Sequence, residues 1–133
     1  MACDQVPESG AVESCAVRVL ILEDDPFIAL DLQAIVEDGG HEVVGTFDTL
    51  AAAQAQFPDS FDFALLDIDL VDVKSFALAS TLLERRIPFA FVSASQRSEL
   101  PMHLRNASFI AKPFEEGAIV RTLQQDRGTP AAH

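Results

Sequence analysis

The stretch VRVLILEDDP, residues 17–26, joins an apolar run directly to a cluster of acids. An almost wholly apolar run of six residues predicts a strand that is covered on both faces, as strands of a parallel sheet are. Asp25 followed by Pro26 is typical of a helix start, with Asp as the N-cap and Pro at the first helical position. Gly39-Gly40 predicts the end of that helix. The chain therefore opens with a strand–helix unit.

The same alternation continues along the chain. Further strands are predicted at 42–47, 63–67, 89–92 and 109–111, and helices at 76–86 and 115–125. Asp48 is predicted to cap an Ala-rich helix that ends before Pro58, and Pro101 makes 98–106 a short or distorted helix. Strands that alternate with helices indicate an α/β protein with a parallel sheet.

Length and composition limit the functions open to this chain. A length of 133 residues predicts one domain, which we place at 17–126 between polar tails at 1–16 and 127–133. A formal net charge of -12 argues against nucleic acid as the main partner. No apolar run approaches the roughly 20 residues of a membrane span, no signal peptide is seen, and Cys3 and Cys15 form no metal or redox motif. We expect a cytoplasmic protein.

Polar side chains follow four of the five predicted strands. They are Glu23, Asp24 and Asp25; Asp67 and Asp69; Ser93; and Lys112, one of two lysines in the chain. Ligands of open parallel sheets bind beyond the carboxyl ends of the strands, so we expect these groups on one rim. Crowded carboxylates repel unless a cation lies among them, and an all-oxygen set suits Mg²⁺, which also binds phosphate. The pattern predicts a phosphoryl-transfer site.

In this order, LEDDP, LLDIDL, FVSAS and AKPF resemble the motifs of receiver domains of two-component response regulators, the CheY-like family, over residues 17–123. The resemblance implies a flavodoxin-like doubly wound (βα)5 fold, with five parallel strands in the order 2-1-3-4-5 and helices on both faces. It also implies a phosphoacceptor signalling protein rather than an enzyme. Asp67 would take a phosphoryl group from a histidine of a sensor histidine kinase or histidine phosphotransferase.

The resemblance assigns roles to the other strand-end residues too. Mg²⁺ would be held by Asp24, Asp67 and the backbone carbonyl of Asp69, with Glu23 acting through a metal-bound water. Ser93 and Lys112 would bind phosphoryl oxygens, and Phe109 would be the aromatic switch residue. Receivers commonly have a cis peptide bond before the proline of this motif, so the Lys112–Pro113 bond is expected to be cis.

The segment Phe91-Val92-Ser93-Ala94-Ser95 resembles the Phe-Ala-Thr-Gly-Tyr motif of a subclass of stand-alone receivers, many of them alphaproteobacterial. This partial likeness suggests sensor histidine kinases as partners. It also suggests that the protein acts as a phosphate sink or by contact with a downstream protein.

Two other functions stay open. Residues 67–71 also fit the DxDx[TV] motif of haloacid-dehalogenase-like phosphatases, although in those enzymes the acidic pair comes last and here Glu23-Asp24 comes first. A receiver fold that binds a partner without ever taking phosphate is the other alternative. Three departures from the family pattern keep this alternative open. Val71 stands where the family commonly has Pro, Ser75 stands about where it has Gly, and the stretch 93–112 is shorter than usual.

Several residues are given structural roles. His41 and His103 have no partner at ligand spacing and are expected on the surface, and Asp72, like the side chain of Asp69, can be a plain loop acid. The segment 97–106 is expected to have few apolar anchors and to rearrange on activation, while Phe109 stays inward.

Overall fold

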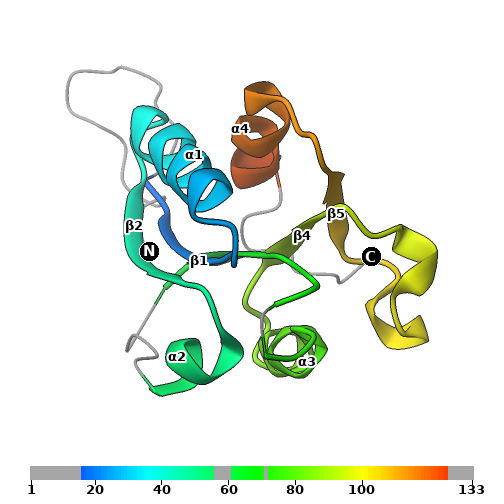
Figure 1. Cartoon of the computed structure of the whole chain (residues 1–133). Helices are drawn as coiled ribbons and strands as arrows, with labels where there is room; N and C mark the ends of the chain where they lie inside the picture. Colours follow the sequence, from blue (N-terminus) through cyan, green and yellow to red (C-terminus); the bar gives the residue numbers. More distant parts are fainter. Residues whose placement is uncertain (1–15, 56–60, 71, 126–133) are drawn as a thin grey trace.

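The computed structural model describes residues 16–55, 61–70 and 72–125. Its strands are β1 (Arg18–Leu22), β2 (Glu42–Phe47), β3 (Phe63–Leu66), β4 (Phe89–Ser93) and β5 (Ser108–Ala111). They form one parallel sheet in the order β2-β1-β3-β4-β5 (Figure 1), which confirms the predicted order. The predicted tails apart from Ala16, together with Cys3, Cys15, Val71 and the predicted helix end before Pro58, lie outside the described residues.

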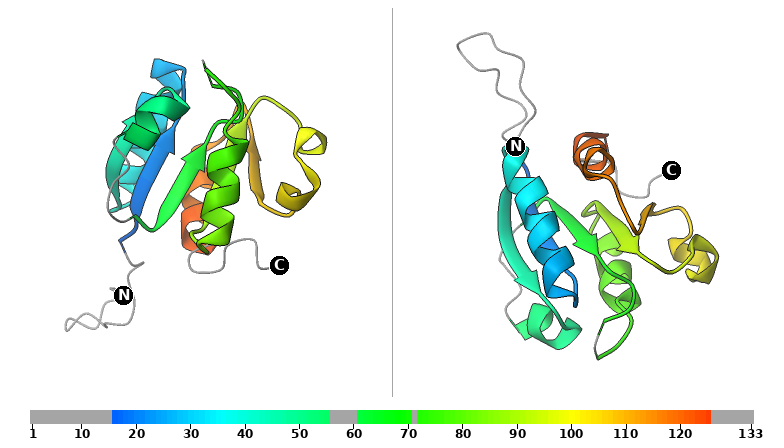
Figure 2. Two further views of the ribbon diagram at one scale, coloured as in Figure 1. Left: turned by 90° about the horizontal axis from the view of Figure 1, so that it is seen from below. Right: turned by 45° about the horizontal axis from the view of Figure 1, so that its top comes forward.

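Helices cover both faces of the sheet. Helices α1 (Pro26–Asp38) and α4 (Glu116–Gln125) lie on one face, and α2 (Leu50–Ala55) and α3 (Phe76–Glu84) lie on the other (Figures 1 and 2). Each face has its own apolar core, because alternate strand residues point to opposite sides. Val19 and Ile21 pack toward α1 and α4, whereas Leu20 and Leu22 pack toward α2 and α3. This packing fixes the strand ends that carry the site.

Helix α1 begins and ends as its sequence predicts. The side chain of Asp25 accepts hydrogen bonds from the backbone N–H groups of Phe27 (2.9 Å) and Ile28 (3.3 Å). The helix stops at Asp38, and Gly40 follows with a φ of 87°, a backbone conformation that glycine adopts without strain.

The predicted cap of the Ala-rich helix is wrong. The Thr49 hydroxyl accepts from the N–H of Ala52 at 3.0 Å, and the carboxylate of Asp72 accepts from the N–H groups of Leu50 (3.1 Å) and Ala51 (3.2 Å). Asp72, in the loop after β3, is thus a cap of a helix about 20 residues earlier and not a plain loop acid. Asp48 makes none of the described bonds to the start of α2.

The segment between β4 and β5 contains two short 3₁₀ turns, η2 (Arg97–Glu99) and η3 (Met102–Leu104), in agreement with the predicted distortion around Pro101. The expectation of few apolar anchors is wrong. Leu100 and Leu104 are each 1% exposed and belong to the core of the α2–α3 face. Arg97 and Arg105 donate further hydrogen bonds to backbone carbonyls within the segment, at 2.7 to 2.9 Å.

The two histidines differ in their surroundings. His103 is exposed as expected, and its Nε2 lies 2.7 Å from the hydroxyl of Ser80. His41 is buried, contrary to expectation, and its Nδ1 accepts a hydrogen bond of 2.9 Å from the N–H of Val17. A ring nitrogen thus satisfies a backbone donor just before β1. Among the described helices, none is both long and apolar enough to cross a membrane.

Candidate functional site

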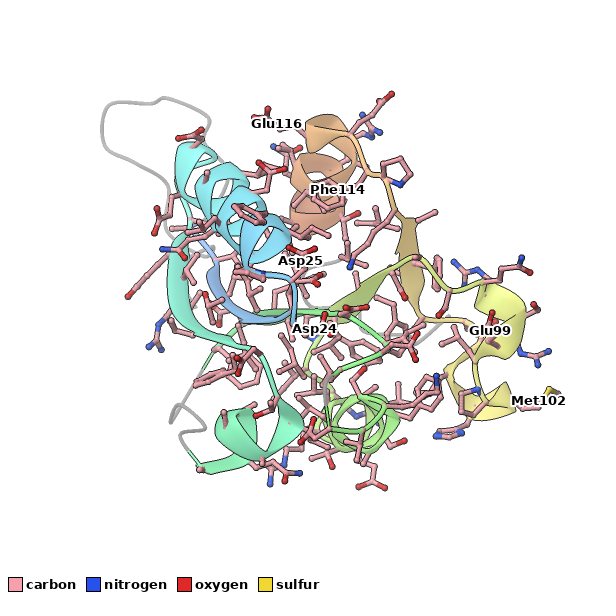
Figure 3. The ribbon with its side chains drawn as sticks, in the orientation of Figure 1. Asp24, Asp25, Glu99, Met102, Phe114 and Glu116 are labelled. Atoms are coloured by element: carbon pink, nitrogen blue, oxygen red, sulfur yellow. The ribbon has the colours of Figure 1, made fainter. Side chains whose placement is uncertain are left out.

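Three carboxylates meet at the carboxyl ends of β1 and β3. Glu23 and Asp24 follow β1, and Asp67 follows β3, the neighbouring strand in the sheet. One oxygen from each lies within 4.8 Å of the others. Figure 3 shows Asp24 beside Asp25, where the chain passes from β1 into α1. The predicted gathering of the strand-end acids is therefore present in the structure.

Lys112, directly after β5, points into this acidic cluster. Its Nζ lies 2.9 Å from Oε1 of Glu23, and it donates hydrogen bonds to Oε2 of Glu23 at 3.1 Å and to Oδ2 of Asp67 at 3.4 Å. The Lys112 N–H donates to the carbonyl of Ser93 at 2.9 Å, which ties the lysine to the end of β4. The Lys112–Pro113 peptide bond is cis. One ammonium group thus contacts two carboxylates from two other strands.

Burial dominates the electrostatics of the cluster. Glu23 is 2% exposed and Asp67 is 6% exposed. Burial raises the pKa of Glu23 to about 7, although its hydrogen bond with Lys112 acts in the opposite sense. Burial also raises the pKa of Asp67, and this effect is larger than the opposing effect of the positive charge of Lys112, which lowers that pKa. Burial by itself would lower the pKa of Lys112, but the hydrogen bond with Glu23 and the charge of Asp67 outweigh it, so that its pKa is raised.

The residues present fit a magnesium ion. Oε1 of Glu23 is buried and makes no well-aligned hydrogen bond; its 2.9 Å approach to Lys112 is an ion-pair contact only. A buried oxygen with unused lone pairs, beside two more carboxylates, suits a hard cation or one of its bound waters. A groove of about 630 Å³ opens beside Glu23 and Asp24, between α1 and the end of β2, and gives solvent a route to this side of the cluster.

The described side-chain hydrogen bonds of Asp69 and Ser93 are made with residues outside the carboxylate cluster. The Asp69 carboxylate accepts hydrogen bonds from Lys74 and from the Ser95 hydroxyl, the latter at 2.7 Å. The Ser93 hydroxyl, which is buried, accepts from the N–H of Ser95 at 3.1 Å. Ser95 therefore joins the loops that follow β3 and β4.

Phe109 lies away from the carboxylates. It is partly buried and packs against the core on the α2–α3 face. The Arg97 guanidinium lies over its ring, 5.5 Å from the centroid, in a cation–π contact. Its ring is thus partly inward in this state, and that it stays inward on activation remains a prediction.

The sequence gives no signal for three residues that shape the site. Lys74 and Ser95 hold the Asp69 side chain, and Ser75 donates a hydrogen bond to the carbonyl of Asp67 at 2.6 Å. All three contacts cross between loops or span a turn, so only the folded chain brings the partners together. Ser95 stands in the segment that resembles the Phe-Ala-Thr-Gly-Tyr motif and Ser75 about where the family has Gly, but neither likeness predicts these contacts.

Comparison with known proteins agrees with this geometry. The family model for the response regulator receiver domain matches residues 19–124. A curated relative, the phyllosphere-induced regulator PhyR of Methylorubrum extorquens, is 33% identical over 129 residues, which are 92% of this chain and 48% of that protein. This chain spans about half the length of the curated relatives it matches.

Solved structures show the same fold. SdrG from Sphingomonas melonis Fr1 has a TM-score of 0.71 and 34% identity, covering 81% of this chain and 93% of that one. The receiver domain of PhyR from Erythrobacter litoralis has a TM-score of 0.72 and 30% identity, covering 83% of this chain and 88% of that one.

Proposed function

Since this chain belongs to the family of response regulator receiver domains, we propose that it is a Mg²⁺-dependent phosphoacceptor whose nucleophile is Asp67. The observation that carries the proposal is the buried Asp67 carboxylate, which lies among Glu23, Asp24 and the Lys112 ammonium at the ends of three strands. Phosphoryl transfer depends on positioning and charge neutralisation more than on covalent machinery, and this arrangement supplies both.

The donor we propose is a phosphorylated histidine of a sensor histidine kinase or histidine phosphotransferase. An Asp67 carboxylate oxygen attacks the phosphorus, a P–O bond forms, the P–N bond breaks, and the imidazole leaves with the bonding electrons. The Lys112 ammonium, 3.4 Å from Oδ2 of Asp67, offsets negative charge on the transferred group. The Ser93 hydroxyl, at the end of the next strand, is the proposed donor to a phosphoryl oxygen.

Asp24, Asp67 and the backbone carbonyl of Asp69 are the proposed Mg²⁺ ligands, with Glu23 reaching the ion through water. When bound, the cation supplies charge neutralisation for both the crowded carboxylates and the incoming phosphoryl group. The oxygen-only donor set, in which three carboxylates face one ammonium group, supports this assignment.

The proposed role is that of a cytoplasmic signalling protein rather than an enzyme. We propose that the domain, at 17–126, acts by contact with another protein or as a phosphate sink. The family match supports a signalling role, since it covers nearly all of the described residues. A receiver fold that never takes phosphate is the competing function, and the phosphorylation experiment separates the two.

The test is incubation with acetyl phosphate and Mg²⁺, followed by intact-mass and peptide mass spectrometry. We expect one added phosphoryl group, on the peptide that contains Asp67, and none in Asp67→Asn. Asp31→Asn is the matched control: it removes an exposed carboxylate of α1 that lies outside the cluster, so it is expected to keep the modification. A phosphoryl group that persists in Asp67→Asn, or its absence from the native chain, contradicts the proposal.

A further inference from the structure

Ser75, directly before α3, makes a pair of hydrogen bonds to the chain just after β3. Its hydroxyl donates to the carbonyl of Asp67 at 2.6 Å, and its N–H donates to the carbonyl of Ile68 at 3.0 Å. The residue is fully buried. One side chain and one backbone group of Ser75 therefore hold two successive peptide units at the point where Asp67 leaves the strand.

The Ser75 hydroxyl makes a hydrogen bond that is unusual for a residue at the start of a helix. Ser75 is the N-cap residue of α3, where a serine side chain ordinarily accepts from N–H groups of the first turn. Here the side chain makes no such bond. The hydroxyl is turned toward Asp67 instead, so α3 gives up a stabilising cap in favour of a contact with the candidate phosphoacceptor.

The Asp67 carbonyl needs this partner because the sheet no longer provides one. Strand β3 ends at Leu66, and its ladder with β4 ends at the Leu66–Phe91 pair. The N–H of Asp67 is held on the other side by the carbonyl of Leu22 in β1, at 2.8 Å. A buried carbonyl without a partner is costly, so the Ser75 hydroxyl completes the backbone hydrogen bonding of Asp67.

We propose that Ser75 is a positioning residue of the phosphoacceptor: its hydroxyl fixes the peptide unit that follows Asp67 and so sets the direction of the Asp67 carboxylate toward Lys112. The inference rests on the proposed function. A carboxylate whose backbone is fixed on both sides attacks from one geometry, and small misplacements of a reacting group slow a reaction steeply. A glycine at position 75 supplies the N–H to Ile68 and leaves the Asp67 carbonyl unbonded.

The test measures the phosphorylation rate with acetyl phosphate and Mg²⁺, at a temperature where each variant is folded. We expect Ser75→Ala to lower the maximal rate by about tenfold, with little change in the acetyl phosphate concentration at half-maximal rate. Ser75→Thr keeps a hydroxyl and is expected to recover much of the rate. Ser75→Gly keeps the N–H without the hydroxyl, so it is expected to be slow and serves if Ser75→Ala does not fold.

Two controls separate positioning from stability. Ser80→Ala removes a hydroxyl from α3 that contacts His103, away from the cluster, and is expected to react at the native rate. The ¹⁹F resonance of beryllofluoride bound to each variant reports the geometry at Asp67 and is expected to shift only in the variants that lack the Ser75 hydroxyl.

The outcomes are distinct. The positioning role is overturned if Ser75→Ala and Ser75→Gly are phosphorylated at the native rate. It is also overturned if Ser75→Thr reacts as slowly as Ser75→Ala while its ¹⁹F resonance is not shifted. A native chain that takes neither phosphoryl group nor beryllofluoride overturns the proposed function instead.

Discussion

The balance of charge around Asp67 is unfavourable in the protein without a cation. Two nearly buried carboxylates, Glu23 and Asp67, and the less buried Asp24 face a single ammonium group, that of Lys112. The raised pKa values of Glu23 and Asp67, caused first by burial, express the cost of keeping both charged. A cation that binds here relieves this cost and stabilises the folded state.

Mg²⁺ is therefore expected to raise the melting temperature of the native protein. At ten times the dissociation constant the expected shift is about 5 °C, because a ligand that binds only the folded state stabilises it by mass action. Asp24→Ala is expected to abolish the shift and to raise the melting temperature of the metal-free protein, since one repelling charge is gone. Differential scanning calorimetry with Mg²⁺ and with EDTA measures both effects.

Asp31→Ala is the matched control for this prediction, because Asp31 is an exposed acid on α1 outside the carboxylate cluster. It is expected to keep the full shift. If Mg²⁺ does not change the melting temperature of the native protein, the acidic cluster does not hold the ion.

Sequence inspection finds the charged residues of the site and misses the residues that hold them. Glu23, Asp67 and Lys112 are predictable because each directly follows an apolar strand, and parallel strands end on the same rim. The Ser75 hydroxyl contacts a carbonyl eight residues earlier through a turn, and no local pattern encodes that contact. Backbone hydrogen bonds after a strand end depend on loop geometry, which composition does not specify.

At the level of elements, the α2 cap shows a similar limit. Asp48 and Thr49 both stand where an N-cap is expected, and local preference favours either. The structure uses Thr49 together with Asp72, which the β3–α3 loop carries back to the start of α2. A tertiary contact thus decides between two local candidates, and it links α2 to the loop that follows the candidate phosphoacceptor.

Two buried leucines, Leu100 and Leu104, anchor the segment that contains η2 and η3 to the core, in addition to its hydrogen bonds. Leu104 is 1% exposed within the core of the α2–α3 face. Leu104→Ala is expected to lower the free energy of unfolding by about 3 kcal/mol, because it leaves a cavity among buried side chains. Urea denaturation measures the change.

The neighbouring Met102→Ala is the control, since Met102 is 81% exposed (its position is labelled in Figure 3). It is expected to change the free energy of unfolding by less than about 0.5 kcal/mol. Equal effects of the two substitutions contradict the view that Leu104 anchors the segment. Sequence inspection underrates Leu100 and Leu104 because Pro101 breaks the helical spacing between them, although each still reaches the core.

At the scale of the whole molecule, Ser95 links the loop after β3 to the loop that leads from β4 toward the edge strand β5. Its N–H donates to the Ser93 hydroxyl, and its own hydroxyl donates to the Asp69 carboxylate, so Ser95 contacts the loops that follow β3 and β4. η2 begins two residues later, beside β5 (Figure 1). Under the proposed function, Ser93 shifts toward a phosphoryl oxygen, and we expect this shift to change the first of these bonds and to move the start of the η2–η3 segment.

We therefore predict that activation changes the segment 97–106. Its described backbone hydrogen bonds are mostly single turns, such as Leu100 to Arg97 and Leu104 to Pro101, and arginine side chains bind other carbonyls. Such bonds can change while Leu100 and Leu104 stay buried, so the rearrangement costs little core packing. The measurement is amide hydrogen exchange with and without beryllofluoride, and we expect altered protection across 97–106.

Ser95→Ala sharpens this experiment, because it removes the bond to Asp69 and keeps the N–H that binds Ser93. If Ser95 transmits the change at Asp67 to the segment 97–106, beryllofluoride is expected to change the hydrogen exchange of this segment less in the variant than in the native protein. Beryllofluoride is still expected to bind at Asp67 of the variant. Unchanged protection across 97–106 in the native protein, with all changes confined to α2 and α3, contradicts the prediction and favours a response through the loop after β3, where Asp72 accepts from the start of α2.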